Sequence, residues 1–203
     1  MSVVSANLVK DLRERTGAGM MDCKKALDEA GGDMEKAVRV LREKGLAKSA
    51  KVSGRKAGEG LVAAYVHTGG KVGALVEINC ETDFVARTDE YQALARDLAI
   101  QVVASNPRWI RRDQVPAAVL DTERDILRQE AKSSGKPPAV IEKMVEGRLE
   151  KFYKEACLLE QPFVREQDIT VEEVIQRAIT KMGEKIEIKR VTRFQLGEDL
   201  AGS

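Results

Sequence analysis

The chain has 203 residues, a length that suits one sizeable core or a small module followed by a core. Charged residues make up 33% of it, and 34 Lys and Arg side chains balance 33 Asp and Glu side chains. This balance excludes an overall field that would draw in nucleic acid or an anionic membrane, so we expect neither as a direct partner.

The sequence also limits where in the cell the protein can work and which metal or redox chemistry it can carry out. The longest apolar run, Leu61 to Val66, is far shorter than the roughly 20 residues that span a bilayer, and the N-terminus lacks a signal-peptide segment. We therefore expect a cytoplasmic protein. Cys23, Cys80 and Cys157 lie too far apart for zinc or redox motifs, so we expect free buried thiols. We also expect no metal and no cofactor.

Three short helical patterns fill residues 4–45. Apolar residues recur at helical spacing in three sets: Val4, Leu8 and Leu12; Met20, Cys23, Ala26, Leu27 and Ala30; Met34, Ala37, Val38 and Leu41. Glycines at 17, 19, 31 and 32 separate the sets, Asp33 is suited to cap the third helix, and Gly45 to end it. The pattern predicts a small three-helix bundle.

A domain boundary is expected after these helices. Residues 46–60 hold four basic side chains among Ala, Ser and Gly, with too little apolar surface to pack. We therefore predict a three-helix module over residues 1–50, a linker over 51–59 and a separate core over 60–203.

The core begins with a predicted β-hairpin. Two strand-like runs, Gly60 to His67 and Lys71 to Glu81, meet around Gly69-Gly70, where glycine tolerates the positive φ of a tight turn. One face of the second run is apolar and is expected to be buried; it consists of Val72, Ala74, Val76, Ile78 and Cys80.

Helices follow the hairpin. Periodicity and proline positions predict helices over residues 89–104, 116–133, 138–156 and 170–182. A last strand is expected near the C-terminus, with Ile186, Ile188, Phe194 and Leu196 sharing one face and Val191 out of phase. The predicted core is therefore α+β, a small antiparallel sheet covered by helices.

The segment Thr82-Asp83-Phe84-Val85 stands between the second strand and the first of these helices. An aromatic side chain at such a junction, after a carboxylate and before small or apolar residues, is poorly placed for a core. Two rigid neighbours would let Phe84 press into a groove on another protein. The alternative is that Phe84 is a core aromatic and Asp83 the N-cap of the following helix.

Met20 and Met21 are a second candidate surface. Adjacent helical positions point about 100° apart, so both side chains cannot face a three-helix core equally, and one should be exposed. Methionine suits an adaptable contact surface, although it is also a common core filler. Arg13 could flank this surface or be a solvated helix residue.

An enzymatic site is the less favoured interpretation. His67 is the only histidine, which removes Ser–His and Cys–His catalysis and multi-histidine metal sites. A metal or acid–base site built from His67, Cys80, Glu81 and Asp83 remains an alternative, without the phosphate loop or nucleophile elbow that usually accompanies such chemistry.

Several motifs resemble a known family. The runs Leu8 to Leu27 (LVKDLRERTGAGMMDCKKAL) and Glu77 to Arg87 (EINCETDFVAR) are similar to two signatures of bacterial translation elongation factor Ts. The runs SGKP at 134–137, EKMVEGR at 142–148 and EQPFV at 160–164 are similar to its third region. The matches occur in the right order over nearly the whole chain.

The resemblance implies a guanine nucleotide exchange factor for elongation factor Tu, with no covalent chemistry of its own. By resemblance, a module similar to ubiquitin-associated domains contacts the partner's nucleotide-binding domain through Arg13, Met20 and Met21. Thr82 to Val85 match the stretch that dislodges the partner's magnesium ion, with Asp83 and Phe84 inserted between two partner helices. His67 matches a further contact residue.

The chain departs from longer family members after Val103. It is expected to lack both a second sheet-containing half and an inserted coiled coil, so the resemblance predicts a homodimer that rebuilds the two-lobed core. Two rival interpretations are an adaptor for a ubiquitin-like or nucleic-acid ligand and a hydrolase that relies on Glu81 or Asp83. Neither accounts for the ordered matches.

Overall fold

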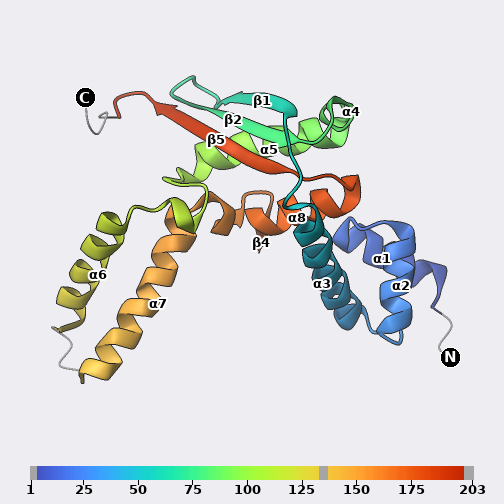
Figure 1. Cartoon of the computed structure of the whole chain (residues 1–203), viewed down its shortest axis with the longest axis horizontal. Helices are drawn as coiled ribbons and strands as arrows, with labels where there is room; N and C mark the ends of the chain where they lie inside the picture. Colours follow the sequence, from blue (N-terminus) through green and yellow to red (C-terminus); the bar gives the residue numbers. More distant parts are fainter. Residues whose placement is uncertain (1–3, 133–136, 199–203) are drawn as a thin grey trace. The chain divides into compact units, whose positions relative to one another are not determined.

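A computed structural model describes residues 4–132 and 137–198 of the chain (Figure 1). In chain order the elements are α1 (Ala6–Thr16), α2 (Met20–Glu29), α3 (Met34–Val52), β1 (Glu59–Val66), β2 (Val72–Cys80), α4 (Asp83–Ala86), α5 (Asp89–Ser105), η1 (Arg112–Gln114), α6 (Ala117–Lys132), α7 (Pro138–Ala156), η2 (Leu158–Glu160), β3 (Pro162–Phe163), β4 (Glu166–Thr170), α8 (Val171–Met182) and β5 (Glu187–Gln195). This order confirms the α+β class.

The chain divides into two compact units. The first holds the residues up to Val62 together with Glu77–Leu94 and Glu173–Lys189. The second holds Ala63–Val76, Ala95–Glu172 and the residues from Arg190 onward. The predicted boundary at residues 51–59 stays a prediction.

The three N-terminal helices form as predicted. The Asp33 carboxylate accepts a hydrogen bond from the Lys36 N–H at 3.0 Å and caps α3. Gly17 ends α1 with a φ of 67°, a left-handed conformation that favours glycine. The bundle core consists of Val9, Leu12, Cys23, Ala26, Leu27 and Ala37. Met20 is absent from this core, so its place in the predicted apolar set was wrong.

The prediction that Gly45 ends the third helix was also wrong. Helix α3 continues to Val52, which is buried, and only residues 53–58 lie outside helix and strand before β1. Gly45 is itself buried, and a Cβ atom there would lie 3.3 Å from Thr180 Oγ1 of α8. The glycine therefore permits close approach of two helices instead of terminating one.

The sheet has the order β1-β2-β5. Its first two strands form the predicted hairpin, in which the Gly70 N–H donates to the His67 carbonyl at 2.9 Å. The predicted inner face of β2 is confirmed, since Ala74, Val76, Ile78 and Cys80 are buried and Val72 partly so. Helix α5 adds a buried stripe made of Leu94, Ala95, Leu98, Ala99, Val102 and Val103.

Strand β5 departs from the predicted alternation. Ile186 and Ile188 are buried as expected, but Phe194 is 66% exposed and Leu196 is 77% exposed. The phase changes at Lys189 and Arg190, which are both exposed, so Val191 and Arg193 become the more buried positions after them. A phase change of one residue sends later side chains to the opposite face.

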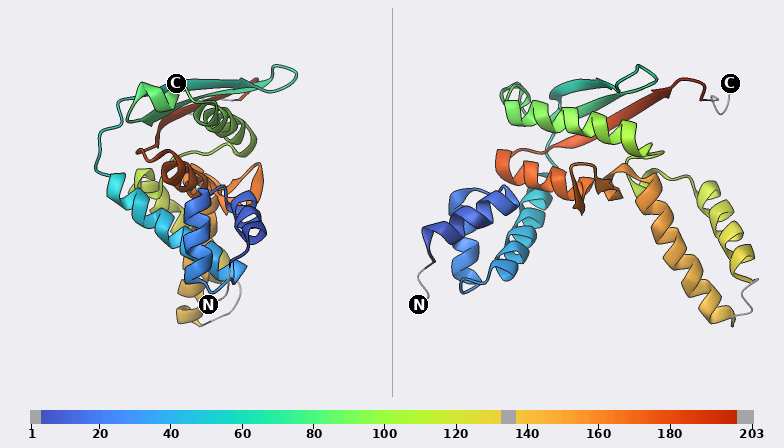
Figure 2. Two further views of the ribbon diagram at one scale, coloured as in Figure 1. Left: turned by 90° about the vertical axis from the view of Figure 1, so that its right-hand side faces the viewer. Right: turned by 180° about the vertical axis from the view of Figure 1, so that it is seen from behind.

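The second unit contains an antiparallel helix pair, α6 and α7, which lie side by side in Figures 1 and 2. Its seam buries Leu127, Ala131, Val145 and Leu149. Ion pairs cross it, among them Arg128 to Glu142 at 3.1 Å and Arg148 to Glu130 at 2.5 Å. The predicted helices over residues 116–133 and 138–156 are therefore confirmed. Ser134, Gly135 and Lys136 of the SGKP motif lie outside the described residues.

Candidate partner-binding site

The short helix α4 presents Phe84 to solvent. The Phe84 side chain is 77% exposed, whereas the next two residues, Val85 and Ala86, are buried. Successive helical positions rotate by about 100°, so one turn can send Phe84 outward while its neighbours pack inward. The alternative interpretation of Phe84 as a core aromatic was wrong.

Hydrogen bonds fix this turn at both ends. Thr82, not Asp83, is the N-cap, and its Oγ1 accepts from the Val85 N–H at 3.4 Å. At the other end the Thr88 hydroxyl donates to the Val85 carbonyl at 2.8 Å and accepts from the Tyr91 N–H at 3.3 Å. The turn is therefore joined to α5 without a loose connection. We define residues 82–88 as the Phe84 turn.

A carboxylate from the other end of the first unit holds the start of the turn. Glu184 Oε2 accepts from the backbone N–H groups of Glu81 at 3.0 Å and Thr82 at 3.1 Å. Glu184 Oε1 accepts from the Thr82 hydroxyl at 2.7 Å. In return, Glu81 Oε1 accepts from the Lys185 N–H at 2.6 Å and from Arg55 at 3.3 Å. The end of β2 is thus tied to the segment after α8.

Two buried residues near the turn, Cys80 and Tyr91, carry titratable side chains. The Cys80 thiol donates to the Thr82 carbonyl at 3.1 Å. Burial raises the pKa of the Cys80 thiol and that of the Tyr91 phenol, because a charged form would lose its hydration there. Neither group is therefore charged at neutral pH.

Asp83 is the charged neighbour of Phe84. Its carboxylate lies 2.9 Å from an Arg87 guanidinium nitrogen, four residues along, and both side chains are exposed. Exposed pairs of this kind contribute little to stability, because water screens them. The Asp83 carboxylate is therefore available to a partner at small cost.

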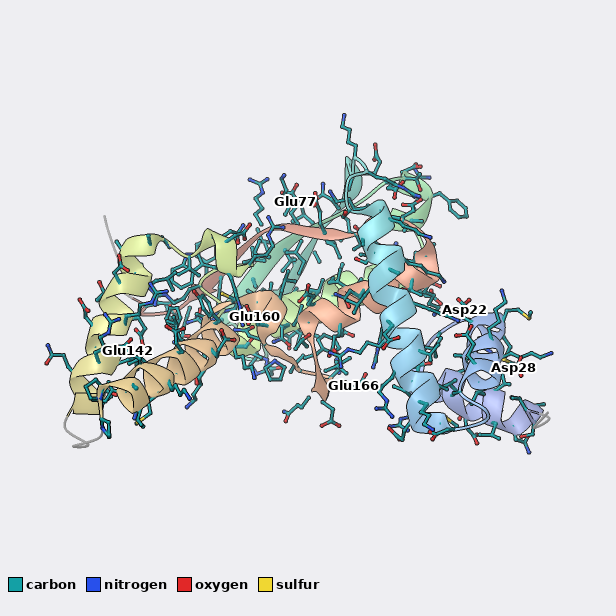
Figure 3. The ribbon with its side chains drawn as sticks, turned by 60° about the horizontal axis from the view of Figure 1, so that its bottom comes forward. Asp22, Asp28, Glu77, Glu142, Glu160 and Glu166 are labelled. Atoms are coloured by element: carbon teal, nitrogen blue, oxygen red, sulfur yellow. The ribbon has the colours of Figure 1, made fainter. Side chains whose placement is uncertain are left out.

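Met20 and Met21 form the second exposed surface of the first unit. Met20 is 50% exposed and Met21 64% exposed, so both side chains, not one, face solvent. They are the first two residues of α2, whose N-cap, Gly19, makes no side-chain hydrogen bond. Asp22, labelled on α2 in Figure 3, pairs with Lys48 of α3 at 3.0 Å. Arg13 on α1 is also exposed.

His67 belongs to the second unit, where it is exposed at the β1–β2 turn. Its Nδ1 lies 3.1 Å from the Tyr65 hydroxyl oxygen. Within the described residues, no group of three or more His, Cys, Asp or Glu side chains is arranged to hold a metal ion. No helix in the described part of the chain is long and apolar enough to cross a membrane.

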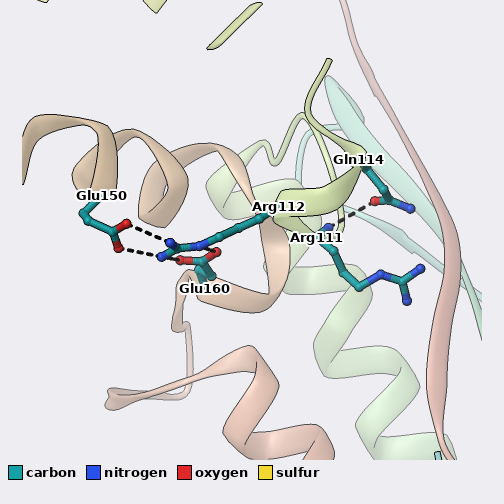
Figure 4. A network of polar contacts seen from close by, with 5 residues as sticks. All are labelled: Arg111, Arg112, Gln114, Glu150 and Glu160. Carbon is teal, nitrogen blue, oxygen red and sulfur yellow. Dashed lines mark hydrogen bonds and ion pairs between the residues drawn. The ribbon is translucent and has the colours of Figure 1, made fainter. Parts of the chain in front are cut away.

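A polar cluster in the second unit has a structural role (Figure 4). Arg112 of η1 donates two hydrogen bonds to the Glu150 carboxylate, at 2.8 and 2.7 Å, and also pairs with Glu160. Its guanidinium carbon lies 4.4 Å from the centre of the Tyr153 ring. The hydrogen bond from Arg112 lowers the pKa of Glu150. This cluster joins η1 to α7 and η2.

Sequence reasoning missed Glu184, Glu81 and Arg55 as supports of the Phe84 turn. Glu184 is 102 residues from Thr82 in the chain, so no local pattern links the two. The one local signal was Gly183, which suits the end of a helix and marks a change of chain direction there.

Taken together, a three-helix module, a small α+β core and an aromatic side chain fixed in an exposed position define a factor that acts by binding another protein. The elongation factor TS family model matches residues 4–198. Elongation factor Ts of Carboxydothermus hydrogenoformans is 60% identical over 199 residues, which cover 98% of this chain and 92% of the relative. That of Desulforamulus reducens is 58% identical over 200 residues (98% and 92%), and that of Fervidobacterium nodosum 56% over 195 (96% and 99%).

The chain therefore belongs to the elongation factor Ts family, the nucleotide exchange factors of elongation factor Tu in translation elongation. It is not an enzyme, and it works in the cytoplasm as a translation factor. Elongation factor Tu is its partner.

Proposed function

We propose that this chain releases GDP from elongation factor Tu by inserting the Phe84 ring between partner helices that support the bound magnesium ion. The observation that carries the proposal is the 77% exposure of Phe84 on a turn whose next residue, Val85, is buried. A rigidly held anchor loses little conformational freedom on binding, so more of its contact energy is available to displace partner groups.

The chemistry of the partner explains why displacement is enough. A GTPase holds GDP through backbone donors on the phosphates and through a magnesium ion that neutralises them. A wedge that shifts those supports weakens both interactions, and no covalent bond changes. Because coupling between two ligands is reciprocal, a factor that loosens the nucleotide is itself loosened when GTP binds.

The four residues of the TDFV segment have different tasks in this proposal. Phe84 is the wedge, and Asp83 offers an exposed carboxylate beside it. Thr82 and Val85 keep the turn in place, since Thr82 caps α4 and the Val85 side chain is buried in its own chain. They act on the partner through the position of Phe84.

Met20, Met21 and Arg13 supply a separate contact with the nucleotide-binding domain of the partner. Methionine is unbranched and has three rotatable bonds, so an exposed pair can adapt to a surface that changes as nucleotide leaves. Arg13 adds a positive charge to that contact. His67, exposed on the hairpin of the second unit, provides a further contact.

Homodimer formation is part of the proposal. Three large apolar side chains on strands of the second unit are exposed, Val66, Leu75 and Phe194, and so is Leu196, the residue after β5. A Cβ atom at Gly73 would lie 3.3 Å from Val66 Cγ2, so Gly73 and Val66 share one face of the hairpin, and Leu75, two residues after Gly73, shares it too. An uncovered apolar sheet face supports burial against a second copy.

Light scattering tests the dimer. At micromolar concentration the mass should be twice the 22.4 kDa of one chain, and Leu196→Asp should lower it toward one chain. A parent protein with the mass of one chain contradicts the dimer without bearing on the wedge.

Release of a fluorescent GDP from elongation factor Tu tests the exchange mechanism. Adding this protein should accelerate release, and added magnesium should oppose the acceleration, because the ion and the wedge compete for the same partner residues. Release at the spontaneous rate contradicts the proposed function. Acceleration that is insensitive to magnesium contradicts the displacement of the ion.

A further inference from the structure

The Phe84 turn is held by a carboxylate that follows α8. We infer that Glu184 is a positioning residue for nucleotide exchange. It fixes the direction of Phe84 through Thr82 while the ring is pressed against the partner, and in this way it raises the maximal rate of nucleotide exchange. This inference rests on the proposed function of Phe84 and adds a residue that neither touches the partner nor belongs to the TDFV segment.

Both carboxylate oxygens of Glu184 are engaged. Oε2 accepts from two successive amides, Glu81 at 3.0 Å and Thr82 at 3.1 Å, and Oε1 accepts from the Thr82 hydroxyl at 2.7 Å. Strand β2 ends at Cys80, so these amides follow the last residue of the strand. The Glu184 carboxylate is the acceptor of both amides, and a hydrogen bond to a carboxylate is stronger than one to a neutral acceptor.

The bonds run in both directions. While Glu184 accepts from the Glu81 and Thr82 amides, the Glu81 carboxylate accepts from the Lys185 amide at 2.6 Å. Arg55, three residues beyond α3, also donates to Glu81 at 3.3 Å. Two adjacent residues on each side therefore exchange hydrogen bonds, which resists both sliding and rotation of one segment against the other.

Helix α8 provides the rigid base for this arrangement. Gly183 has a φ of 77°, and its N–H donates to the Ile179 carbonyl at 2.9 Å, so the helix ends in a left-handed turn that leads directly to Glu184. Helix α8 in turn packs on α3, where Gly45 allows close approach to Thr180. A force on Phe84 is thus carried to two long helices of the same unit.

The burial pattern separates this role from a role in general stability. Val85 and Ala86 are buried and fix the turn to the core, whereas Thr82 is exposed and Glu184 only partly buried. Loss of the Glu184 side chain should leave the apolar core intact. The Phe84 side chain should stay exposed, but its direction should no longer be fixed. The expected consequence is a lower maximal exchange rate with little change in complex formation.

The test compares Glu184→Ala with Glu172→Ala. Glu172 is an exposed carboxylate on α8, the helix that precedes Glu184, and it makes no side-chain hydrogen bond or ion pair to any residue within 4–132 and 137–198. In fluorescent GDP release from elongation factor Tu, Glu184→Ala should lower the maximal rate about tenfold, with the half-saturating concentration within about twofold of the parent. Glu172→Ala should match the parent in both.

Two further variants keep the test decisive. Glu184→Gln retains the size and one acceptor oxygen, so its maximal rate should lie between those of the parent and Glu184→Ala. Thr82→Val removes the hydroxyl that donates to Glu184. If Glu184 acts through Thr82, the double variant should be slowed by less than the product of the two single effects. A double variant that is slowed by the full product of the two single effects overturns the inference.

Amide hydrogen–deuterium exchange of the free protein gives a readout that does not depend on nucleotide exchange activity. Amides of Glu81 and Thr82 should lose protection by about tenfold in Glu184→Ala, while those of α1 to α3 keep theirs. A parental maximal rate, or unchanged protection at these amides, overturns the inference. If the parent itself accelerates no GDP release, the proposed function fails, and the amide protection still decides whether Glu184 holds the turn.

Discussion

Phe84 and the Met20–Met21 pair both present apolar side chains of the first unit to solvent, but the chain holds them differently. Phe84 follows an N-cap with a side-chain hydrogen bond and precedes two buried residues. Met20 and Met21 begin a helix whose N-cap, Gly19, has no side chain to cap it. The aromatic ring has two rotatable bonds on a fixed turn, whereas each methionine has three at the start of a helix without a side-chain cap.

This difference predicts a division of work between the two regions. A fixed ring can force a change in the partner and should therefore govern the step in which nucleotide leaves. Flexible thioethers can follow a surface that changes shape, and should therefore contribute affinity in both states of the partner. Interactions of the first kind affect the maximal rate, and those of the second kind the half-saturating concentration.

The largest expected effect is that of Phe84→Ala. The maximal rate of GDP release should fall about a hundredfold, because an anchor residue of this kind is worth a few kcal/mol at an interface. The free energy of unfolding should change by less than about 0.5 kcal/mol, since the ring is exposed. Stopped-flow release of fluorescent GDP and urea unfolding measure the two quantities.

A matched control for this variant is Ile126→Ala. Ile126 is another exposed apolar residue, 48% exposed on α6 of the second unit. Its loss should leave GDP release unchanged. Equal exchange rates for Phe84→Ala and the parent remove the wedge from the mechanism.

The next largest effect is expected from Met20→Asp. A charge in the methionine surface should raise the half-saturating concentration about tenfold, because the carboxylate must lose water on binding. The maximal rate should stay within about twofold of the parent. Met20→Leu, which keeps the apolar surface, is the control. A lower maximal rate at unchanged affinity would reverse the roles assigned to the two regions.

The exposure of Phe84 could be predicted from the sequence because its signals are local: an alternating strand, a short polar segment and a helical stripe within about thirty residues. The support from Glu184 could not, because the partners are 102 residues apart and each carboxylate looks like any solvated charge in the sequence.

Gly45 shows the second reason for error. Glycine favours the end of a helix, but it also permits close approach of two helices, and sequence alone does not separate the two uses. Only the presence of Thr180 beside Gly45 decides between them. Phe194 was misassigned for a related reason, since two exposed residues, Lys189 and Arg190, change the phase of β5.

The smallest expected effect is a difference in how readily the three-helix module and the Phe84 turn open locally. Cys23 lies in the core of the three-helix module and Cys80 beneath the Phe84 turn, and both are buried. Burial raises the pKa of each thiol, and that of Cys157 to about 11. Because the thiolate is the reactive form, labelling of the folded protein at pH 8 should be far slower than labelling of the unfolded chain.

The pH dependence has a definite sign. A raised thiol pKa stabilises the fold fully below the unfolded pKa, about 8.5, and this stabilisation is lost as the pH rises through the folded pKa. Labelling of variants that each keep one cysteine should therefore accelerate above pH 9 more steeply than that of the denatured chain. Because the module core is small, Cys23 should react about fivefold faster than Cys80 at each pH. Faster labelling of Cys80 would mean that the Phe84 turn opens more readily than the module, and the fixed ring could not then be the element that drives exchange.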